Sequence, residues 1–382
     1  MDALGRAIQI VRRQEPHSGA HVITTVDRRI QEVAERAMGA HAGAVVVLDP
    51  RSGDVLAMTS SPAFDLDQFT GPLGKDAWLK LVRDARFPLL NRAIQSQYAP
   101  GSLFKVVVTA AALQEGVITP SDRLRCGPSF QLGRWEFRNW EDKDWGEINL
   151  RQAIVRSCNT FFYQLGLKVG IDAMARYAQA FGLGAPSEIA ISGEKPGLVP
   201  FPPLRRAGQP WHLGDTVNVS IGQGQLLVTP LQVARMMAAI ASDGILWKPR
   251  LVQRVEGPDG RLLYSEANEV NGYVELSPVV WAFLRQALWG VVNEGGTGAA
   301  ARLPGFDVAG KTGTAQSVAR SHSARGPDHA WFAAFAPAHD PVVVVAVLVE
   351  RGGKGGQAAA PIARQILRGI FLEKVAMAGA SG

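Results

Sequence analysis

Ser102 and Lys105, three residues apart in "YAPGSLFK", are the side chains of this sequence best suited to covalent chemistry. A serine hydroxyl is a poor nucleophile until a neighbouring base takes its proton, and a lysine one helical turn away can reach it. The pair alone does not decide the matter, because serine is also a favoured helix N-cap and the run "LFKVVVTAAAL" is typical of a buried helix. A catalytic role needs support from elsewhere in the chain.

Two further short motifs carry polar side chains suited to the same chemistry. They are "SCN", with Ser157 and Asn159, and "GKTGTAQ", with Lys311. Each also has a purely structural interpretation, because "SCN" could cap a helix and "KTGTAQ" could be an exposed strand with a turn glycine. To act as a base, Lys105 must be neutral, and burial together with the charge of Lys311 would lower its pKa in that direction.

Strands near both ends of the chain and helices between them must position these motifs. A short strand from His21 leads through capping residues to an amphipathic helix, and apolar runs predict hairpins over 43–62 and 329–352 that could share one sheet. Residues 65–244 are largely helical. The sequence therefore predicts an α+β fold, with an antiparallel sheet subdomain at about 21–64 and 245–375 and an inserted helical subdomain at about 65–244.

Composition limits the class of protein. The 382 residues are 47% hydrophobic, enough for a large core, and 40 basic against 34 acidic residues give a net charge of +6 that is scattered along the chain. We find no aromatic-and-basic pattern of a nucleic-acid module. The longest apolar stretch, "PVVVVAVLVE", is too short to cross a bilayer and predicts a buried strand, and the N-terminus lacks the apolar core of a signal peptide.

The order of the three motifs resembles the signature of the penicillin-binding protein and serine β-lactamase superfamily. Longer stretches, "YAPGSLFK", "SCNTFFYQLG", "VSIGQGQLLVTPLQVARMMAAIASDG" and "VAGKTGTAQ", resemble class B penicillin-binding proteins, particularly the elongation-type penicillin-binding protein 2 group. The resemblance implies a transpeptidase domain over 21–382 after a residual linker at 1–20. Members of the group have a membrane anchor and an N-terminal pedestal, so we expect this chain to be the periplasmic catalytic part of a longer, inner-membrane protein.

The resemblance also implies a reaction, peptidoglycan D,D-transpeptidation during cell-wall elongation. Ser102 would attack the D-Ala-D-Ala carbonyl of a stem peptide, release D-alanine and pass the acyl group to an amine on another strand. β-Lactams would acylate the same serine. Ser157 would relay a proton to the departing amine, Asn159 would hold an amide of the stem peptide, and Lys311 would supply positive charge.

Substrate binding is implied for the strand that carries Lys-Thr-Gly. The hydroxyls of Thr312 and Thr314 would bind the terminal carboxylate, and Gly313 would leave room for the peptide alongside the strand. Backbone N–H groups of Ser102 and Thr314 would form the oxyanion hole. The reaction needs no metal or organic cofactor. The implied partners are stem peptides, β-lactams and a membrane glycosyltransferase of the elongation machinery, reached through regions outside this chain.

Other functions fit parts of the same pattern. A β-lactamase must activate water, and class A enzymes use a glutamate after Ser-x-Asn, whereas the nearest look-alike here, Glu147 in "EINL", precedes it. A D,D-carboxypeptidase uses the same motifs, and a β-lactam sensor or scaffold would keep the fold without the reaction. The intact motif positions argue against a degraded site.

Cys126 and Cys158 are the two cysteines, and Cys158 lies inside "SCN". Some relatives in the penicillin-binding protein 2 group hold zinc here through the cysteine matching Cys158. Asn139 and Glu147, however, stand where an aspartate and a histidine are expected, and a neutral amide is a poor zinc ligand. A disulfide and two unrelated buried thiols are the competing interpretations. We expect the two cysteines to approach one another and leave these three interpretations open.

Overall fold

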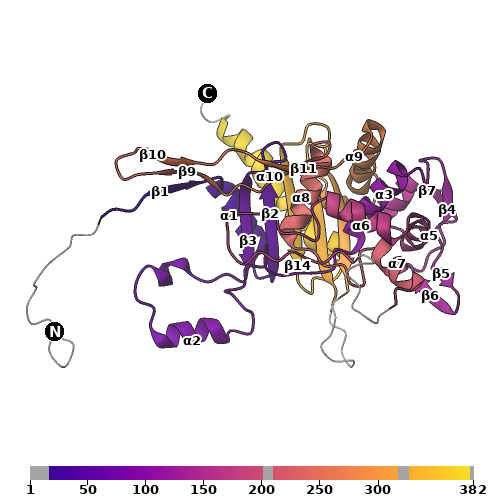
Figure 1. Cartoon of the computed structure of the whole chain (residues 1–382), viewed down its shortest axis with the longest axis horizontal. Coiled ribbons are helices and arrows are strands. Elements are labelled where there is room, and N and C mark those ends of the chain that lie inside the picture. Colours follow the sequence, from indigo (N-terminus) through magenta and orange to yellow (C-terminus); the bar gives the residue numbers. More distant parts are fainter. Residues whose placement is uncertain (1–16, 201–209, 317–326, 379–382) are drawn as a thin grey trace, which may run out of the picture.

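A five-stranded antiparallel sheet forms the centre of the molecule (Figure 1). The computed structural model describes residues 17–200, 210–316 and 327–378. The strands lie in the order β12 (Ala309–Ala315), β13 (His329–Ala336), β14 (Val343–Val349), β2 (Gly43–Leu48) and β3 (Val55–Ser61). Both predicted hairpins are present and share this sheet, which confirms that prediction. The strand with the Lys-Thr-Gly motif, β12, lies at one end of this order.

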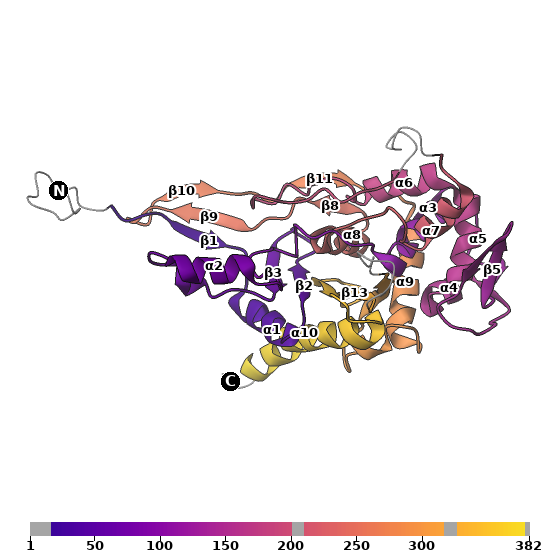
Figure 2. The same ribbon diagram turned by 90° about the horizontal axis from the view of Figure 1, so that it is seen from below.

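Helices cover both faces of the sheet (Figure 2). Val45 and Val47 pack with α1 (Arg28–Met38) and α10 (Gly355–Ala378), whereas Val46 points to the opposite face, which α8 (Pro230–Ala241) covers. This alternation follows from the two-residue period of a strand. All residues of α8 are buried, which explains why its sequence is apolar on nearly every side.

Most of the other helices gather beyond β12, at one end of the sheet (Figure 1). They are η2 (Gly101–Leu103), α3 (Lys105–Gln114), α4 (Leu150–Arg156), α5 (Asn159–Val169), α6 (Ile171–Ala180), α7 (Leu213–Ser220) and α9 (Pro278–Asn293). Two small two-stranded sheets lie among them, one of β4 (Arg123–Arg125) with β7 (Glu147–Asn149) and one, a hairpin, of β5 (Ser129–Leu132) with β6 (Trp135–Arg138). The predicted α+β class, with helices inserted into a sheet, is confirmed.

Several short elements lie outside both groups. β1 (His21–Thr24) pairs with β9 (Val252–Glu256), which also pairs with β10 (Leu262–Ser265), and β8 (Ile245–Trp247) pairs with β11 (Val270–Tyr273). η1 (Leu66–Phe69) and α2 (Lys75–Arg83) also lie outside both groups, whereas η4 (Ala299–Ala301) packs against α10 and α9. The first strand of the chain therefore belongs to a separate arm, and α2 lies apart from the other helices (Figure 1). The predicted linker falls largely outside the described residues, since 1–16 are not described.

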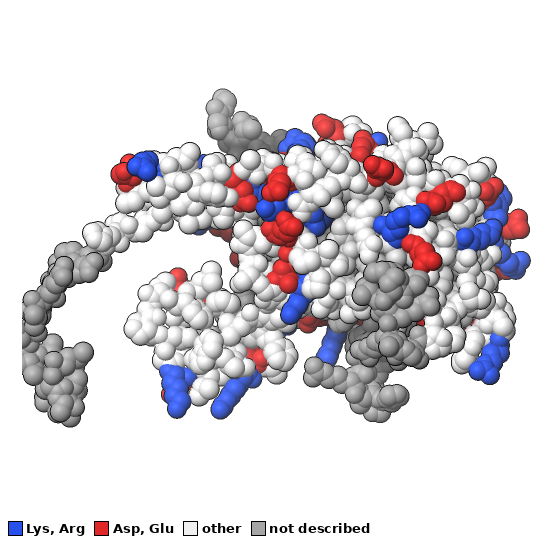
Figure 3. All heavy atoms as spheres, in the orientation of Figure 1, with Lys and Arg blue, Asp and Glu red and all other residues white. Residues whose placement is uncertain are grey.

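The surface carries charges of both signs side by side on the face drawn in Figure 3. This arrangement matches the scattered charges of the sequence and differs from the single-signed surface of a nucleic-acid module. Within residues 17–200, 210–316 and 327–378, none of the helices has the length and apolar character that crossing a bilayer requires.

Two glycines let three segments of backbone meet beside β12. The Gly101 N–H donates to the Gly222 carbonyl at 2.9 Å, and both glycines have positive φ, +54° and +75°. A Cβ built on Gly101 would collide with the Thr314 carbonyl, and one on Gly222 would collide with the backbone of Gly101. The loop that carries Ser102 therefore packs directly against the main chain of β12 because both positions lack a side chain.

We predict that Gly101→Ala costs about 3 kcal/mol of unfolding free energy, because the new methyl group adds a backbone clash to the strain of a left-handed alanine. The matched control is Gly116→Ala. Gly116 also has positive φ, +66°, but has no atom within 4 Å of its would-be Cβ, so about 1 kcal/mol is expected. Urea denaturation of the two variants measures the difference, and equal losses would contradict the packing role of Gly101.

Candidate active site

Ser102 lies in η2, directly before α3, on a loop held at both sides. Tyr98 exchanges backbone hydrogen bonds with Val228, at 2.9 and 2.8 Å, and the indole N–H of Trp331 on β13 donates to the Ala99 carbonyl at 3.0 Å. Ser102 itself is only partly buried. Its hydroxyl is therefore presented on a fixed loop at the start of a buried helix, the position that the sequence predicted.

Lys105, the first residue of α3, is completely buried. Its ammonium nitrogen donates to the Ser157 carbonyl at 2.7 Å, to Asn159 Oδ1 at 2.6 Å and to Ser157 Oγ at 3.2 Å. Among the described residues, no hydrogen bond joins Lys105 to Ser102. Lys105 thus connects the first motif to the second, and it stands three residues after the candidate nucleophile.

Lys311 on β12 is also completely buried and reaches the same serine. Its nitrogen donates to Ser157 Oγ at 2.8 Å and to the Thr312 carbonyl at 3.1 Å. The three motifs, which are far apart in the sequence, therefore meet at one hydroxyl group. We call Lys105 and Lys311 the lysine pair.

Burial shifts the pKa of both lysines downward. Desolvation is the main cause for Lys105, and the charge of Lys311 lowers the pKa of Lys105 further. Desolvation alone lowers the pKa of Lys311 to about 7. Neither lysine forms an ion pair with any carboxylate in the part of the chain that the structure describes. An uncompensated ammonium is costly in a dry interior, so the neutral amine of Lys105 is favoured, as a proton acceptor requires.

The backbone turns sharply at the Ser-x-Asn motif. Ser157 ends α4 in the left-handed conformation, with φ 56° and ψ 39°, and α5 begins two residues later. This turn directs both the carbonyl and the hydroxyl of Ser157 toward the lysine pair. A non-glycine residue in this region stores strain, of about 1–3 kcal/mol, and such strain is common at functional sites.

Strand β12 carries the residues expected to bind substrate, of which Thr312 is buried and Thr314 is partly buried. Thr312 Oγ1 lies 2.6 Å from Thr297 Oγ1, and Thr314 Oγ1 accepts from the Gly355 N–H at 3.4 Å. A hydroxyl that accepts one hydrogen bond still has its own proton to donate, so Thr314 remains able to bind a carboxylate. No strand among the described residues pairs with β12 on the side away from β13.

The structure gives a physical reason for glycine at position 313 other than the one expected. A Cβ at this position would lie 2.7 Å from the Pro100 carbonyl oxygen and 2.9 Å from Trp331 Cβ. The missing side chain makes room for the loop that carries Ser102 and for the core. This packing role is an additional reason for the glycine, and its expected role toward the substrate stays a prediction.

Comparison with known proteins identifies the family. The penicillin-binding protein transpeptidase domain family matches residues 43–368. The chain belongs to this family. Peptidoglycan D,D-transpeptidase MrdA of Haemophilus influenzae is 34% identical over 390 residues, covering 95% of this chain and 58% of that protein. PbpA of Mycolicibacterium smegmatis is 38% identical over 374 residues, covering 93% of this chain and 73% of that protein. The chain thus spans little more than half the length of the MrdA relative.

Solved structures show the same transpeptidase fold. Pseudomonas aeruginosa PBP2 in complex with WCK 5153 has a TM-score of 0.84 at 35% identity, covering 94% of this chain and 78% of that one. Penicillin-binding protein A of Mycobacterium tuberculosis, as an imipenem acyl-enzyme complex, has a TM-score of 0.81 at 35% identity, and the match covers 92% of this chain and 80% of that one. A chain of a peptidoglycan synthase complex that coordinates polymerization and crosslinking has a TM-score of 0.82 at 34% identity. The match covers 96% of this chain and 66% of that one. The predicted family, with its penicillin-binding protein 2 relatives, and the predicted fold are confirmed.

In this transpeptidase domain the two cysteines form a disulfide. Cys126 and Cys158 are bonded, with Cα atoms 6.2 Å apart, so the expected approach is confirmed and the interpretation as two unrelated thiols is wrong. The sulfurs bind each other, which also leaves no thiolate for the zinc alternative. Glu147 is exposed on β7. Among the described residues, no cluster of three or more His, Cys, Asp or Glu side chains could hold a metal ion.

Asn139 connects this disulfide to the Ser-x-Asn turn. Its Oδ1 accepts from the Asn159 N–H at 2.9 Å, and its Nδ2 donates to the Gly127 carbonyl at 3.3 Å and lies 3.7 and 3.8 Å from the two sulfurs. The sequence suggested Asn139 only as a mismatch in a zinc site. Its amide has instead the donor and acceptor that a positioning residue needs here.

Two other neighbours of the transpeptidase motifs were missed at the sequence level. Gln223 donates to the Thr314 carbonyl at 3.1 Å, and Thr297 contacts the Thr312 hydroxyl. Gln223 lies in "IGQGQ", a stretch that resembles the family but has no obvious chemistry. Thr297 follows two glycines after α9, and no pattern in the sequence marks it.

We predict that replacing both cysteines by serine lowers the unfolding free energy by about 3–4 kcal/mol, because the bridge closes a loop between residues 32 positions apart. Acylation by a β-lactam should also slow, since the loop that holds Asn139 and Asn159 loses its restraint. Urea denaturation with and without reductant measures the first effect. Reductant should destabilise the wild type and leave the double variant unchanged, and identical stability of all samples would contradict the prediction.

Proposed function

We propose that this chain is the catalytic domain of a peptidoglycan D,D-transpeptidase that works through a Ser102 acyl-enzyme. One observation supports this most directly: two buried lysines from different motifs donate to one serine hydroxyl beside the Ser102 loop. A desolvated proton-relay network of this kind suits acyl transfer between amines, in which a proton must be removed and returned in each half-reaction.

The first half-reaction forms the acyl-enzyme. Neutral Lys105 takes the Ser102 proton as Oγ attacks the penultimate D-alanine carbonyl of the donor peptide. The carbonyl oxygen becomes an oxyanion, which the N–H groups of Ser102 and Thr314 stabilise, since Gly101 packs against the Thr314 main chain. The C–N bond then breaks. The departing D-alanine nitrogen receives a proton through Ser157, which Lys105 and Lys311 contact.

The second half-reaction reverses the proton movements with a different amine. The acceptor nitrogen attacks the ester carbon, the new C–N bond forms, and the bond to Ser102 Oγ breaks. The acceptor proton passes through Ser157 to the lysine pair, and Ser102 regains its proton. Lys311 supports both steps as a buried group whose pKa of about 7 allows it to share this proton.

The donor peptide binds along the edge of β12. An extended peptide can add to a free strand edge through main-chain hydrogen bonds. The hydroxyls of Thr312 and Thr314 bind its terminal carboxylate, and Asn159, which Lys105 fixes at 2.6 Å, holds a stem-peptide amide. β-Lactams carry a carboxylate and an amide in a similar arrangement, so they acylate Ser102 in the same groove.

The cellular setting is proposed from the relatives. Peptidoglycan lies outside the cytoplasmic membrane, so the domain acts in the periplasm, as part of a protein that is anchored to the inner membrane. The disulfide is compatible with an oxidising compartment. A related chain occurs in a peptidoglycan synthase complex that coordinates polymerization and crosslinking. The proposed partner is accordingly a membrane glycosyltransferase that polymerises the glycan.

We predict that Ser102→Ala abolishes covalent labelling by fluorescent penicillin, because only this hydroxyl lies at the start of α3. The control is Ser157→Ala, which should slow labelling without abolishing it, since the nucleophile remains. Gel fluorescence and mass spectrometry of the intact chain provide the readout. Labelling of the Ser102→Ala protein at the wild-type mass shift would disprove the proposed function.

We also predict that Lys105→Arg acylates about 100-fold or more slowly, close to Lys105→Ala, because a guanidinium stays protonated and cannot act as a base. Wild-type acylation should rise with pH as neutral Lys105 accumulates. The midpoint should lie well below the ordinary lysine value of 10.5, since burial lowers the pKa of Lys105. Stopped-flow acylation across pH tests both points. A wild-type rate in the arginine variant would assign Lys105 a purely electrostatic role.

A further inference from the structure

Tyr98 stands four residues before Ser102, and its phenol makes a contact that the proposed mechanism does not use. The residue is 9% exposed, and its ring packs edge-on against Trp331 and His329 of β13, with ring centroids 6.1 and 5.2 Å apart. The phenol O–H donates to Glu350 Oε1 at 2.5 Å. Packing and one polar contact therefore fix this side chain at the beginning of the loop that carries the candidate nucleophile.

Glu350 follows β14 directly, and one of its carboxylate oxygens serves two partners. Oε1 accepts from the Tyr98 hydroxyl and from Arg92 Nε, the latter at 3.0 Å. The backbone N–H of Glu350 donates at 2.7 Å to the carbonyl of Ala42, the residue before β2. The carboxylate is thus anchored to the central sheet through its own main chain, independently of the Ser102 loop.

Arg92 holds Glu350 in one orientation. Arg92 is 3% exposed, and each nitrogen of its guanidinium has an acceptor, since one terminal nitrogen donates to the Phe87 carbonyl at 3.1 Å and the other to the Arg86 carbonyl at 2.7 Å. Its backbone N–H donates to Ser60 Oγ in β3 at 2.9 Å. A planar group with a partner on each nitrogen cannot turn away from the carboxylate.

The contact between phenol and carboxylate is stronger than an ordinary hydrogen bond. An ionised acceptor shortens the bond and makes it roughly twice as strong. Burial and the charge of Glu350 raise the pKa of Tyr98, so its hydroxyl keeps its proton and remains the donor. The positive charge of Arg92 offsets the charge of Glu350, which is partly buried. The contact therefore persists at neutral pH.

The phenol is also the side-chain restraint on the start of this loop. Ala99, Pro100 and Gly101, which lie between Tyr98 and Ser102, carry no polar side-chain group. Gly101 has positive φ and no Cβ to limit its backbone conformations. A displacement of about 1 Å between reacting atoms can slow a reaction about 100-fold. Loss of the restraint at Tyr98 should therefore reach the Ser102 hydroxyl.

We propose that Glu350 and Arg92 are positioning residues that hold the Tyr98 phenol, and that the phenol fixes the loop that presents Ser102 to the acyl donor. We call Tyr98, Glu350 and Arg92 the positioning network. Among the described residues, no hydrogen bond joins this network to the lysine pair or to Ser157. The network acts on where the nucleophile lies and leaves proton transfer unchanged. This inference rests on the proposed function and adds positioning residues to it.

The test compares the wild type with Tyr98→Phe, which removes only the hydroxyl. Stopped-flow measurements with fluorescent penicillin at several concentrations give the dissociation constant of the noncovalent complex and the rate constant of acylation separately. We expect the rate constant to fall about tenfold or more, the factor that one hydrogen bond to a charged group supplies. The dissociation constant should stay unchanged. A wild-type rate constant in the folded variant overturns the inference.

The pH dependence of acylation separates positioning from an effect on the base. Because the positioning network does not contact Lys105, Tyr98→Phe should lower the rate constant by the same factor at every pH. The midpoint of the pH profile should stay at the wild-type value. A shifted midpoint would assign the effect to the Lys105 proton and would contradict the inference.

Tyr177 offers a matched control for the loss of a buried phenol. It is 8% exposed, its O–H donates to Glu115 Oε1 at 2.8 Å, and the same oxygen accepts from Arg176 at 2.8 Å. This arrangement lies at the opposite end of α3 from Lys105, about 15 Å along the helix. Tyr177→Phe should therefore lose about as much stability as Tyr98→Phe and still acylate at the wild-type rate. Equal slowing in both variants is incompatible with the inference.

Glu350→Gln tests the carboxylate, and it replaces Tyr98→Phe if that variant does not fold. A neutral acceptor weakens the contact with the phenol, so acylation should slow about threefold. Combined with Tyr98→Phe, the change should have little further effect, since the hydroxyl through which Glu350 acts is then absent. A wild-type rate in Glu350→Gln, or effects of the two changes that multiply, would overturn the inference.

Failure of the proposed function has a different outcome from failure of this inference. Without a Ser102 acyl-enzyme, penicillin would not label the wild type on Ser102 at all. Labelling of Ser102 in the wild type, at a rate that Tyr98→Phe and Glu350→Gln leave unchanged, contradicts the positioning network alone.

Discussion

One serine hydroxyl that receives hydrogen bonds from two buried lysines is the contact on which the rest of this structure depends. Lys105 comes from α3, Ser157 from the turn between α4 and α5, and Lys311 from β12. An unpaired ammonium in an apolar interior is costly, and the described part of the chain offers neither lysine a carboxylate. Burial lowers the pKa of both lysines, which favours their neutral forms and avoids this cost. A lowered pKa is also what proton transfer at neutral pH requires.

Different interactions hold the three segments that carry the motifs in place. Strand β12 is fixed by the antiparallel sheet and its apolar faces, whereas the Ser102 loop is held by backbone contact at Gly101 and Gly222. The Ser-x-Asn turn is held covalently, through Cys158 and the disulfide, and by the Asn139 amide. A strained left-handed serine and two buried amines need such restraint, because each on its own would favour another conformation or an unfolded chain.

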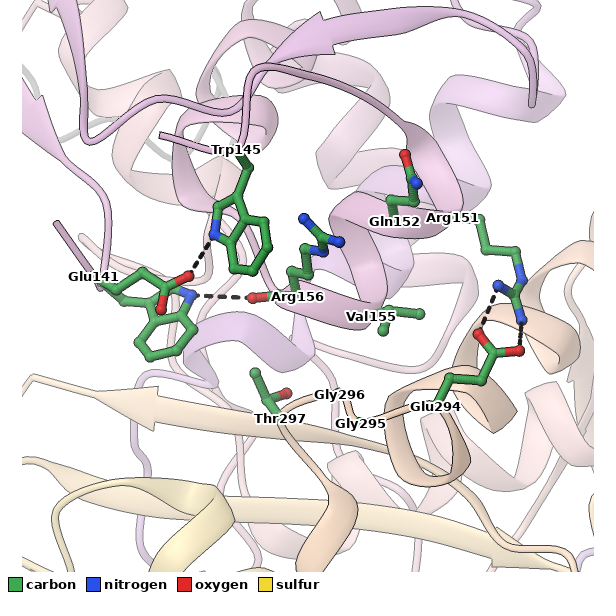
Figure 4. A pocket seen from close by; sticks show the side chains of 11 residues that line it. Glu141, Trp145, Arg151, Gln152, Val155, Arg156, Glu294, Gly295, Gly296 and Thr297 are labelled. Atoms are coloured by element: carbon green, nitrogen blue, oxygen red, sulfur yellow. Dashed lines mark hydrogen bonds and ion pairs between the residues drawn. The ribbon is translucent and has the colours of Figure 1, made fainter. Parts of the chain in front are cut away.

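The proposed donor groove borders a pocket lined by Arg156 and Thr297 (Figure 4). Thr312 belongs to the groove and contacts Thr297 in the pocket, and Ser157 follows Arg156 directly. Residues of this pocket therefore adjoin both the proposed proton relay and the strand that carries the Lys-Thr-Gly motif.

Local patterns in the sequence were sufficient to predict much of this structure. The apolar runs of β2, β3, β13 and β14 predicted their strands. The order of three short motifs predicted the family and indicated the site residues Ser102, Lys105, Ser157, Asn159 and Lys311. Such features can be predicted because apolar runs, helix caps and the spacing of residues within a catalytic motif involve residues close together in the chain.

Tertiary structure decided what depends on residues distant in the sequence. It paired β1 with β9, gave Gly313 a packing role against Pro100 and Trp331, and joined Cys126 to Cys158. It also brought Thr297 and Gln223 to β12 and assembled the pocket beside Ser157 from three separate segments. Local pattern carries no information on these contacts, because each arises where packing of the sheet and the helices brings remote backbone together. The sequence by itself determined which groups could do the chemistry, and only the packed fold determined what surrounds them.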